Sequence, residues 1–289
     1  METSELLKKV RQIEIKTRGL SRNIFAGQYH SAFKGRGMAF SEVREYEFGD
    51  DIRDIDWNVT ARYSKPFIKI FEEERELTVM LLIDVSGSRN FGTVEILKKD
   101  MITEIAATLA FSALQNNDKI GVIFFSDRIE KFIPPQKGRK HILYIIRELI
   151  DFEPKNTNTN IGQVLKYITN AIKKRCTAFV FSDYIDKGDY QGALTIANKK
   201  HDIVAIQVYD SHETEMPKVG MVKVKDAESG FEKYIDTSSV KVRTAYKQWW
   251  EKRQAEMNNA FKRSRVDSVS IHTNEDYVKA LIGLFNIRS

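Results

Sequence analysis

The clearest pattern in the chain is a series of short apolar runs, each followed by polar residues and separated from the next by an amphipathic stretch. The first run, 77–83, holds seven apolar or threonine residues in a row, which is typical of a strand buried on both faces of a sheet. Further strands are predicted at 119–125, 177–181, 203–208 and 268–272. This alternation predicts an α/β fold built on a doubly wound, mostly parallel sheet.

Helical spacing of apolar residues predicts the remaining elements of this fold. The expected helices are 94–114, 140–150, 161–174, 190–200, 240–263 and 274–285. A short strand at 131–135 is predicted to be antiparallel and to lie at the sheet edge, and a small β-hairpin insertion is predicted at about 217–237. Residues 1–76 break the alternation, so we expect an N-terminal extension over 1–76 and a main domain over 77–289.

Polar residues with a possible chemical role follow the first strand. Asp84, Ser86 and Ser88 stand at alternate positions where the strand is expected to leave the sheet. Carboxylate and hydroxyl oxygens are ligands that Mg²⁺ accepts, usually with part of its water shell retained. An ordinary polar turn after a strand explains the same residues about equally well.

Two later segments favour a metal site. The run 177–181 ends in Ser182 and Asp183, and the loop 156–162 leads into a predicted helix with Thr159 or Asn160 as its N-cap. If the strands ending at Asp84 and Asp183 are neighbours, their ends lie only about 5 Å apart. Ligands of open parallel sheets bind beyond the carboxyl ends of the strands. We therefore expect oxygens from both strand ends and from the loop to converge on one Mg²⁺ or Mn²⁺ ion.

These residues resemble the metal-ion-dependent adhesion site (MIDAS) of von Willebrand factor A domains, which combines D-x-S-x-S with a loop threonine and a later aspartate. The matching residues here are Asp84, Ser86, Ser88, Thr159 and Asp183. Thr157 is the competing register for the loop threonine. The resemblance implies that the serines, and in some cases the threonine, bind the metal directly, while the aspartates often act through water. It also implies an open coordination position that an acidic side chain of a partner can fill.

The N-terminal extension carries a second resemblance. It contains G-D-D-x-R-x-I-D-W at 49–57, T-A-R at 60–62 and P-F at 66–67, directly before the strand that ends in the D-x-S-x-S motif. This combination resembles uncharacterised bacterial proteins encoded beside MoxR-type AAA+ ATPases. The resemblance implies a chaperone-like role with such an ATPase, in assembly, activation or remodelling of client proteins that are not known.

Several acidic residues of the extension invite a second metal-site interpretation. Asp50, Asp51, Asp54 and Asp56 lie close together, but Arg53 and Arg62 are interleaved with them. Guanidinium groups pair well with carboxylates, so we expect salt bridges and turn caps here instead of a cation site. Trp57 is expected to anchor a small core in this extension.

Composition and charge limit the function classes further. The chain has 289 residues, a single cysteine, and no apolar run near the ~20 residues that cross a bilayer. No signal-peptide pattern is present, so we expect a cytoplasmic protein without a transmembrane segment. The net charge is +6, and residues 240–265 hold a clear excess of lysine and arginine over glutamate. A basic surface of this kind suits docking to an acidic protein partner. Nucleic acid is disfavoured, because no recognised binding motif accompanies the charge.

No catalytic motif stands out. The chain lacks the G-x-x-x-x-G-K-[ST] phosphate loop and the G-x-S-x-G nucleophile elbow, and Ser86 has no evident base beside it in the sequence. We therefore predict a metal-dependent protein-interaction module and not an enzyme. Two alternatives remain open at this point: a Mg²⁺-dependent hydrolase that uses the same site, and a structural module whose metal site is vestigial.

Overall fold

The structure is a computed structural model that describes all residues except 1–2, 21–37, 74–76, 93–96, 187 and 289. The chain divides into two compact units. One unit comprises Met1–Phe33 and Leu77–Ser289, and the other comprises Lys34–Glu76. This division differs from the predicted one at 76/77, because the first helix belongs with the larger unit.

The larger unit is built on a six-stranded sheet. Its strands are β3 (Thr78–Asp84), β4 (Lys119–Phe125), β5 (Ile129–Gln136), β6 (Thr177–Ser182), β7 (Asp202–Tyr209) and β10 (Asp267–His272). The spatial order is β10-β7-β6-β3-β4-β5, and only the β4–β5 pairing at one edge is antiparallel. Counted along the chain from β3, this order is 6-5-4-1-2-3, which is the doubly wound arrangement. The predicted fold class and the antiparallel edge strand are confirmed.

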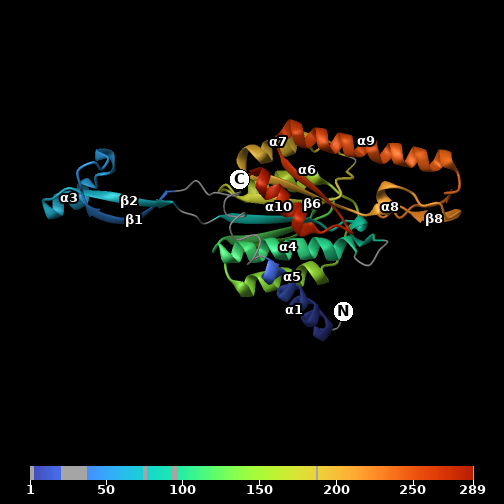
Figure 1. The fold of residues 1–289 in the computed structure, drawn as a ribbon, viewed down its shortest axis with the longest axis horizontal. Helices are drawn as coiled ribbons and strands as arrows, with labels where there is room; N and C mark the ends of the chain where they lie inside the picture. The colour runs from blue at the N-terminus through green and yellow to red at the C-terminus, as the bar shows by residue number, and fades with distance from the viewer. Residues whose placement is uncertain (1–2, 21–37, 74–76, 93–96, 187, 289) are drawn as a thin grey trace. The chain divides into compact units, whose positions relative to one another are not determined.

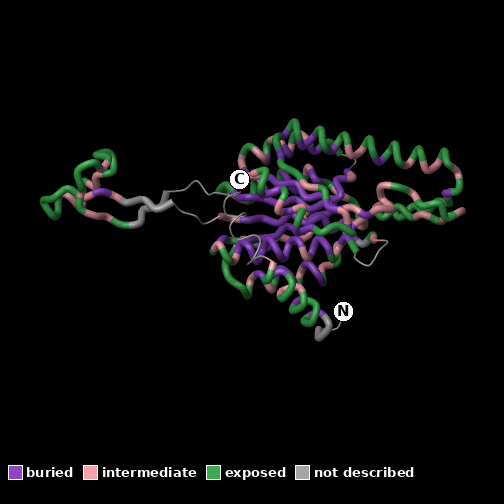
Figure 2. The backbone as a smooth tube through the Cα atoms, in the orientation of Figure 1, coloured by how far each residue is buried: buried purple, intermediate pink, exposed green. Residues whose placement is uncertain are grey.

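Helices cover both faces of this sheet (Figure 1). The helices on one face are α1 (Thr3–Leu20), α4 (Lys98–Gln115), α5 (Arg139–Asp151) and α10 (Tyr277–Arg288). Those on the other face are α6 (Ile161–Ala171), α7 (Gln191–Lys200) and α9 (Val240–Ser264). Side chains of β3 alternate between the two layers: Leu81 packs with the first set and Leu82 with the second, and both are fully buried. Figure 2 shows the resulting buried interior.

Most predicted elements are present with shifted ends. The predicted helix start at 94 falls within 93–96, outside the described residues, and the described helix α4 begins at Lys98. The predicted hairpin is present as β8 (Met221–Lys225) and β9 (Glu232–Asp236), preceded by the one-turn helix α8 (Ser211–Thr214). Among the described helices, none is long and apolar enough to span a bilayer.

The smaller unit holds an antiparallel pair, β1 (Met38–Glu45) and β2 (Phe67–Glu73), a 3₁₀ turn η2 (Ile52–Asp54) and α3 (Trp57–Tyr63). Three of its four clustered aspartates, Asp50, Asp51 and Asp56, are paired or act as caps, as predicted. Asp51 binds Arg53, the Asp56 side chain caps α3, and Asp50 forms a two-pronged ion pair with Arg44, a residue outside the predicted set. The prediction for Trp57 was wrong: its side chain is 70% exposed, so it anchors no core within this unit.

Helix α1 is attached to the main core through one face, which generates a direct test. Leu6 is 4% exposed and belongs to the core cluster, whereas the neighbouring Leu7 is 61% exposed. We expect Leu6→Ala to lower the free energy of unfolding by about 2–3 kcal/mol, because it opens a cavity between α1 and the α4 layer. Leu7→Ala is the matched control and should change stability by less than about 0.5 kcal/mol. Urea denaturation measures both, and equal effects would show that α1 is not packed as described.

Candidate functional site

The predicted site residues lie at the carboxyl ends of the two central strands. The chain leaves β3 toward β4 on one side and reaches β6 on the other, so the order of strands reverses between β3 and β6. Ile83 pairs with Phe181 in the parallel register, which sets Asp84 beside Ser182. The same end of the sheet carries α8 and the β8–β9 hairpin (Figure 1). Ligands of doubly wound folds bind at this reversal point.

Asp84 is buried and receives hydrogen bonds on both carboxylate oxygens. Its Oδ1 accepts from the backbone N–H of Ser86 at 2.9 Å, and its Oδ2 accepts from the hydroxyl of Ser182 at 2.6 Å. Thr159 Oγ1 lies 3.5 Å from the same Oδ2. The Ser182 contact was not predicted, although its position directly before Asp183 at a strand end was visible in the sequence. It fixes the orientation of the Asp84 carboxylate across the β3–β6 boundary.

The second aspartate is joined to the first through the two serines. The hydroxyls of Ser86 and Ser88 lie 3.2 Å apart, and Ser88 in turn hydrogen-bonds the Asp183 side chain. The other Asp183 oxygen, Oδ1, accepts from the backbone N–H of Ile185 at 3.2 Å. The structure therefore brings Asp84, Ser86, Ser88 and Asp183 into one contiguous set of polar contacts.

The geometry separates the two threonine registers. Thr157 Oγ1 donates to the backbone carbonyl of Glu228 at 2.6 Å, so its hydroxyl is engaged by the turn of the β8–β9 hairpin. Thr159 instead faces Asp84. Both threonines precede α6. The N-cap of this helix is Asn160, which is one of the two residues predicted for that position. Thr159 is thus the loop hydroxyl that lies with the other four predicted residues.

The hairpin turn also lies directly on the D-x-S-x-S loop. At Gly87 an added Cβ would lie 2.1 Å from the carbonyl oxygen of Ala227, a distance that no side chain tolerates. The Gly87 backbone N–H donates to the Thr157 carbonyl at 2.9 Å. A glycine between the two serines is therefore required by the close approach of the loop to the hairpin, and the insertion forms one wall beside the site.

Sequence reasoning missed two charged residues at this site. The Lys98 ammonium lies 3.1 Å from Asp183 Oδ2 and 2.6 Å from Glu213 Oε1, and its side chain is only 2% exposed. A signal was present, because Lys98 stands three, four and seven positions before Met101, Ile102 and Ile105, on the apolar stripe of its helix. Glu213 gave no comparable signal, since it comes from the short helix α8, 115 residues away.

Burial and neighbouring charges shift the pKa values of the two aspartates in opposite directions. Burial, together with the negative charge of Asp183, raises the pKa of Asp84 to about 6. Burial also acts to raise the pKa of Asp183, but the Lys98 ammonium and hydrogen bonds from Ser88 and Ile185 more than offset this, so that its pKa is lowered. Asp183 therefore has the Lys98 ammonium beside it, whereas the ionised form of Asp84 is destabilised by burial and by the charge of Asp183.

The donor set of this site fits a hard divalent cation. Three hydroxyl groups and two carboxylates are available, all oxygen, which is the ligand chemistry of Mg²⁺ and Mn²⁺. Among the described residues no group of three or more His, Cys, Asp or Glu side chains could hold a metal, so a site rich in nitrogen or sulfur ligands is not present there. The raised pKa of Asp84 indicates a position where added positive charge is stabilising.

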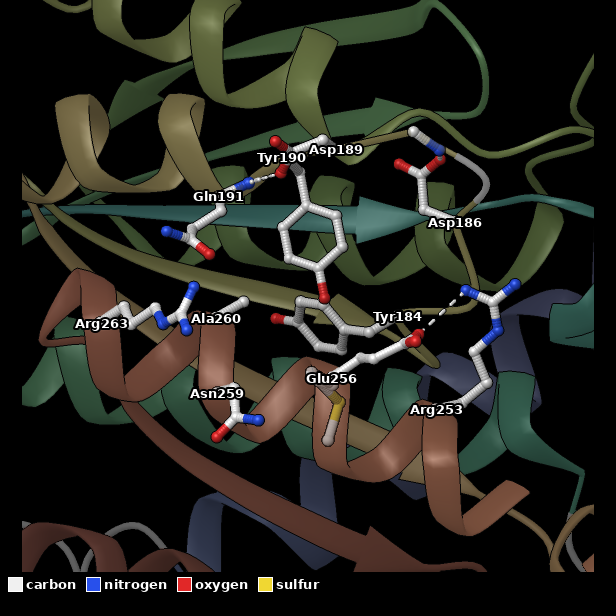
Figure 3. Close-up of a pocket in the computed structure, with 12 residues that line it drawn as sticks. Tyr184, Asp186, Asp189, Tyr190, Gln191, Arg253, Glu256, Asn259, Ala260 and Arg263 are labelled. Carbon is white, nitrogen blue, oxygen red and sulfur yellow. Dashed lines mark hydrogen bonds and ion pairs between the residues drawn. The ribbon is translucent and has the colours of Figure 1, made fainter. Parts of the chain in front are cut away.

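A separate hollow lies between α7 and α9. It has a volume of about 310 Å³ and is lined by Tyr184, Asp186, Tyr190, Arg253, Glu256 and Arg263, among others. In Figure 3 the Arg253 guanidinium points at Glu256, 3.4 Å away, and the two tyrosine rings lie between the helices. None of the five predicted site residues lines this hollow. It is distinct from the candidate metal site.

The sheet order and the oxygen cluster at its reversal point define a doubly wound α/β protein with a candidate cation site. The chain belongs to the family described as "Protein of unknown function DUF58", whose model matches residues 42–256. Similar proteins include an uncharacterized protein of Mycobacterium tuberculosis, 27% identical over 232 residues, which are 80% of this chain and 73% of the relative. The uncharacterized protein YeaD of Bacillus subtilis is 27% identical over 122 residues, 42% of this chain and 27% of YeaD.

Solved structures show partial likeness to the fold. The conserved hypothetical protein BatB from Bacteroides thetaiotaomicron matches with a TM-score of 0.48 and 15% identity, over 73% of this chain and 98% of BatB. The VWA domain of SpRpn10 matches with a TM-score of 0.41 and 12% identity, over 73% of this chain and 95% of that domain.

The buried charge of Asp84 predicts a specific dependence of stability on pH. In metal-free protein its pKa is raised from 3.8 to about 6, so the folded state binds more protons than the unfolded state between these values. The contribution of Asp84 to the free energy of unfolding is therefore favourable at low pH, and it is lost as the pH rises from about 4 to about 6. Asp84→Asn removes the charge and should stabilise the metal-free protein at pH 7 by about 1–3 kcal/mol.

Chemical denaturation in EDTA across this pH range measures the effect. The stability difference between Asp84→Asn and wild type should grow from pH 4 to pH 6 and stay constant above pH 7. Asp151→Asn, at the exposed end of α5, is the control and should show no such change. A variant less stable than wild type at every pH would contradict the assignment of Asp84 as a strained charge.

Proposed function

We propose that this protein is a protein-interaction module with a docking site for an acidic side chain, formed around Mg²⁺ or Mn²⁺. The observation that carries the proposal is the cluster of Asp84, Ser86, Ser88, Thr159 and Asp183 at the reversal point of the sheet. Ser86 and Ser88 present hydroxyl oxygens, and the buried aspartates supply negative charge. When bound, the ion offers a coordination position that a carboxylate of the partner can occupy.

The surroundings of the site support a carboxylate as the recognised group. Helix α9 carries an excess of lysine and arginine over acidic residues, and many of its side chains are exposed. Such a basic surface accelerates the encounter with an acidic partner and makes the association rate depend on salt. Trp250 packs inward at 7% exposure while Trp249 is 40% exposed, as expected for two adjacent residues on a half-buried helix.

We further propose that the partner is a MoxR-type AAA+ ATPase, acting with this protein on client proteins. The support is the sequence resemblance of the extension and the D-x-S-x-S segment to proteins encoded beside such ATPases. A non-enzymatic role fits the site, because the described contacts of the Ser86 hydroxyl are to Ser88 and to the Asp84 side chain, with no imidazole among them. Phosphoester or peptide turnover that disappears with Asp84→Ala would instead support the hydrolase alternative.

The two threonines provide a matched pair for testing the metal site. We expect Thr159→Val to raise the Kd for Mn²⁺ by about tenfold, because it removes the hydroxyl beside Asp84, which corresponds to about 1.4 kcal/mol. Thr157→Val should change the Kd by less than about twofold, since its hydroxyl binds the hairpin. Replacing both Ser86 and Ser88 by alanine should abolish binding.

Isothermal titration calorimetry on the three variants measures these Kd values. Unchanged binding in the double serine variant, or a larger loss for Thr157→Val than for Thr159→Val, would refute the ligand set.

If the protein docks its partner through the metal, removing the metal and removing Asp84 should weaken partner binding through the same loss. Binding of a MoxR-type AAA+ ATPase should weaken to a similar extent in EDTA and with Asp84→Ala, and combining the two should add little. Biolayer interferometry with the immobilised full chain measures this, with Asp151→Ala as the control for general loss of charge. If the ATPase binds equally well with and without divalent metal, the interface lies elsewhere, and the exposed face of α9 becomes the candidate.

A further inference from the structure

Lys98 is a cation that the fold itself places at the candidate metal site. It is the first residue of α4, its side chain is 2% exposed, and its ammonium lies 3.1 Å from Asp183 Oδ2. A lysine is almost never fully buried unless it is paired. The position of this ammonium therefore depends on the acidic side chains that surround it.

Glu213 is the second acceptor for the Lys98 ammonium. Its Oε1 lies 2.6 Å from Lys98 Nζ, closer than Asp183, and its side chain is 13% exposed. The other oxygen of Glu213, Oε2, accepts from the backbone N–H of Asp210 at 2.8 Å, which completes the capping box of α8. Glu213 is thus held in place independently of Lys98. The ammonium is shared between a carboxylate inside the oxygen cluster and a fixed carboxylate beside it.

Positive charge from a lysine and from a divalent ion would act on the same carboxylate. Asp183 Oδ2 is the oxygen that Lys98 contacts, and Asp183 is also one of the five predicted metal residues. Two cations a few ångströms apart in a buried site repel each other strongly, because the effective dielectric constant there is far below that of water. Occupancy of one therefore disfavours occupancy of the other.

We propose that Lys98 is a tethered competitor of the divalent ion at Asp183, and that Glu213 holds the ammonium when metal is bound. This inference rests on the proposed metal site and adds the residue that sets its affinity. Without metal, the Lys98 ammonium neutralises the charge of Asp183 and so reduces the repulsion between the two buried aspartates. With metal, the ammonium gives up Asp183 and keeps only its contact to Glu213. The site is thereby tuned to bind divalent ions more weakly than the same oxygen set would without the lysine.

The competition predicts opposite effects of two substitutions at the same ion pair. Lys98→Met should lower the Kd for Mn²⁺ at least tenfold, because the competing charge is gone while the side-chain volume is nearly kept. Glu213→Gln should raise the Kd several-fold, because the ammonium then depends on Asp183 alone. Lys99→Met, one residue further along the same helix, is the matched control and should leave the Kd within twofold of wild type.

Isothermal titration of the whole 289-residue chain with MnCl₂ at constant pH and ionic strength measures these values, with circular dichroism to verify folding. Lys98→Met leaves Glu213 without its partner, so the double variant Lys98→Met/Glu213→Gln is included and should also bind Mn²⁺ more tightly than wild type. If wild type binds Mn²⁺ but neither lysine variant binds it more tightly, the competitor role is refuted and the metal site stands. If wild type and all variants fail to bind at millimolar Mn²⁺, the proposed metal site itself is refuted, and the role of Lys98 with it.

Discussion

Two buried carboxylates at the ends of neighbouring strands are the constraint on which the site depends. Asp84 is 4% exposed and Asp183 is 6% exposed, and the negative charge of Asp183 helps to raise the pKa of Asp84 to about 6. Two such charges cannot persist side by side in a buried place without positive charge nearby. The fold supplies this charge through Lys98, and the proposed divalent ion would supply more.

The architecture explains why they meet. The reversal of strand order between β3 and β6 sets their carboxyl ends together, and the α6 loop, the first turn of α4 and the β8–β9 hairpin surround them. The serine hydroxyls connect the aspartates, and Ser182 fixes Asp84 across the strand boundary. Such an arrangement sacrifices stability, because hydroxyl and carboxylate groups occupy positions that apolar side chains could fill. Buried polar groups that lower stability in this way are expected at a binding site and not in a core whose only role is packing.

The sequence predicted the sheet well because its strands are buried on both faces. A short continuous apolar run such as 119–125 is readily recognised as a strand, and the predicted and observed bounds of β4 agree. Four residues of the cluster, Asp84, Ser86, Ser88 and Asp183, could be named because D-x-S-x-S and the polar end of β6 are local patterns. The loop threonine was assigned to Thr159 from its place before the following helix, with Thr157 as the competing register. The contact of Thr157 with the hairpin turn at Glu228, 71 residues away, could not be read from the sequence. Glu213 was missed for the same reason, whereas Lys98 was missed although its place on the apolar stripe of α4 was visible in the sequence. Trp57 was misjudged because aromatic character alone does not determine burial.

Anomalous diffraction at the manganese edge, from crystals of the full chain grown with MnCl₂, tests the central claim most directly. The account predicts one strong peak among the hydroxyls of Ser86, Ser88 and Thr159, with the Lys98 ammonium withdrawn from Asp183 and in contact with Glu213. The absence of a peak at this position under saturating MnCl₂, with Lys98 still bound to Asp183, would contradict it.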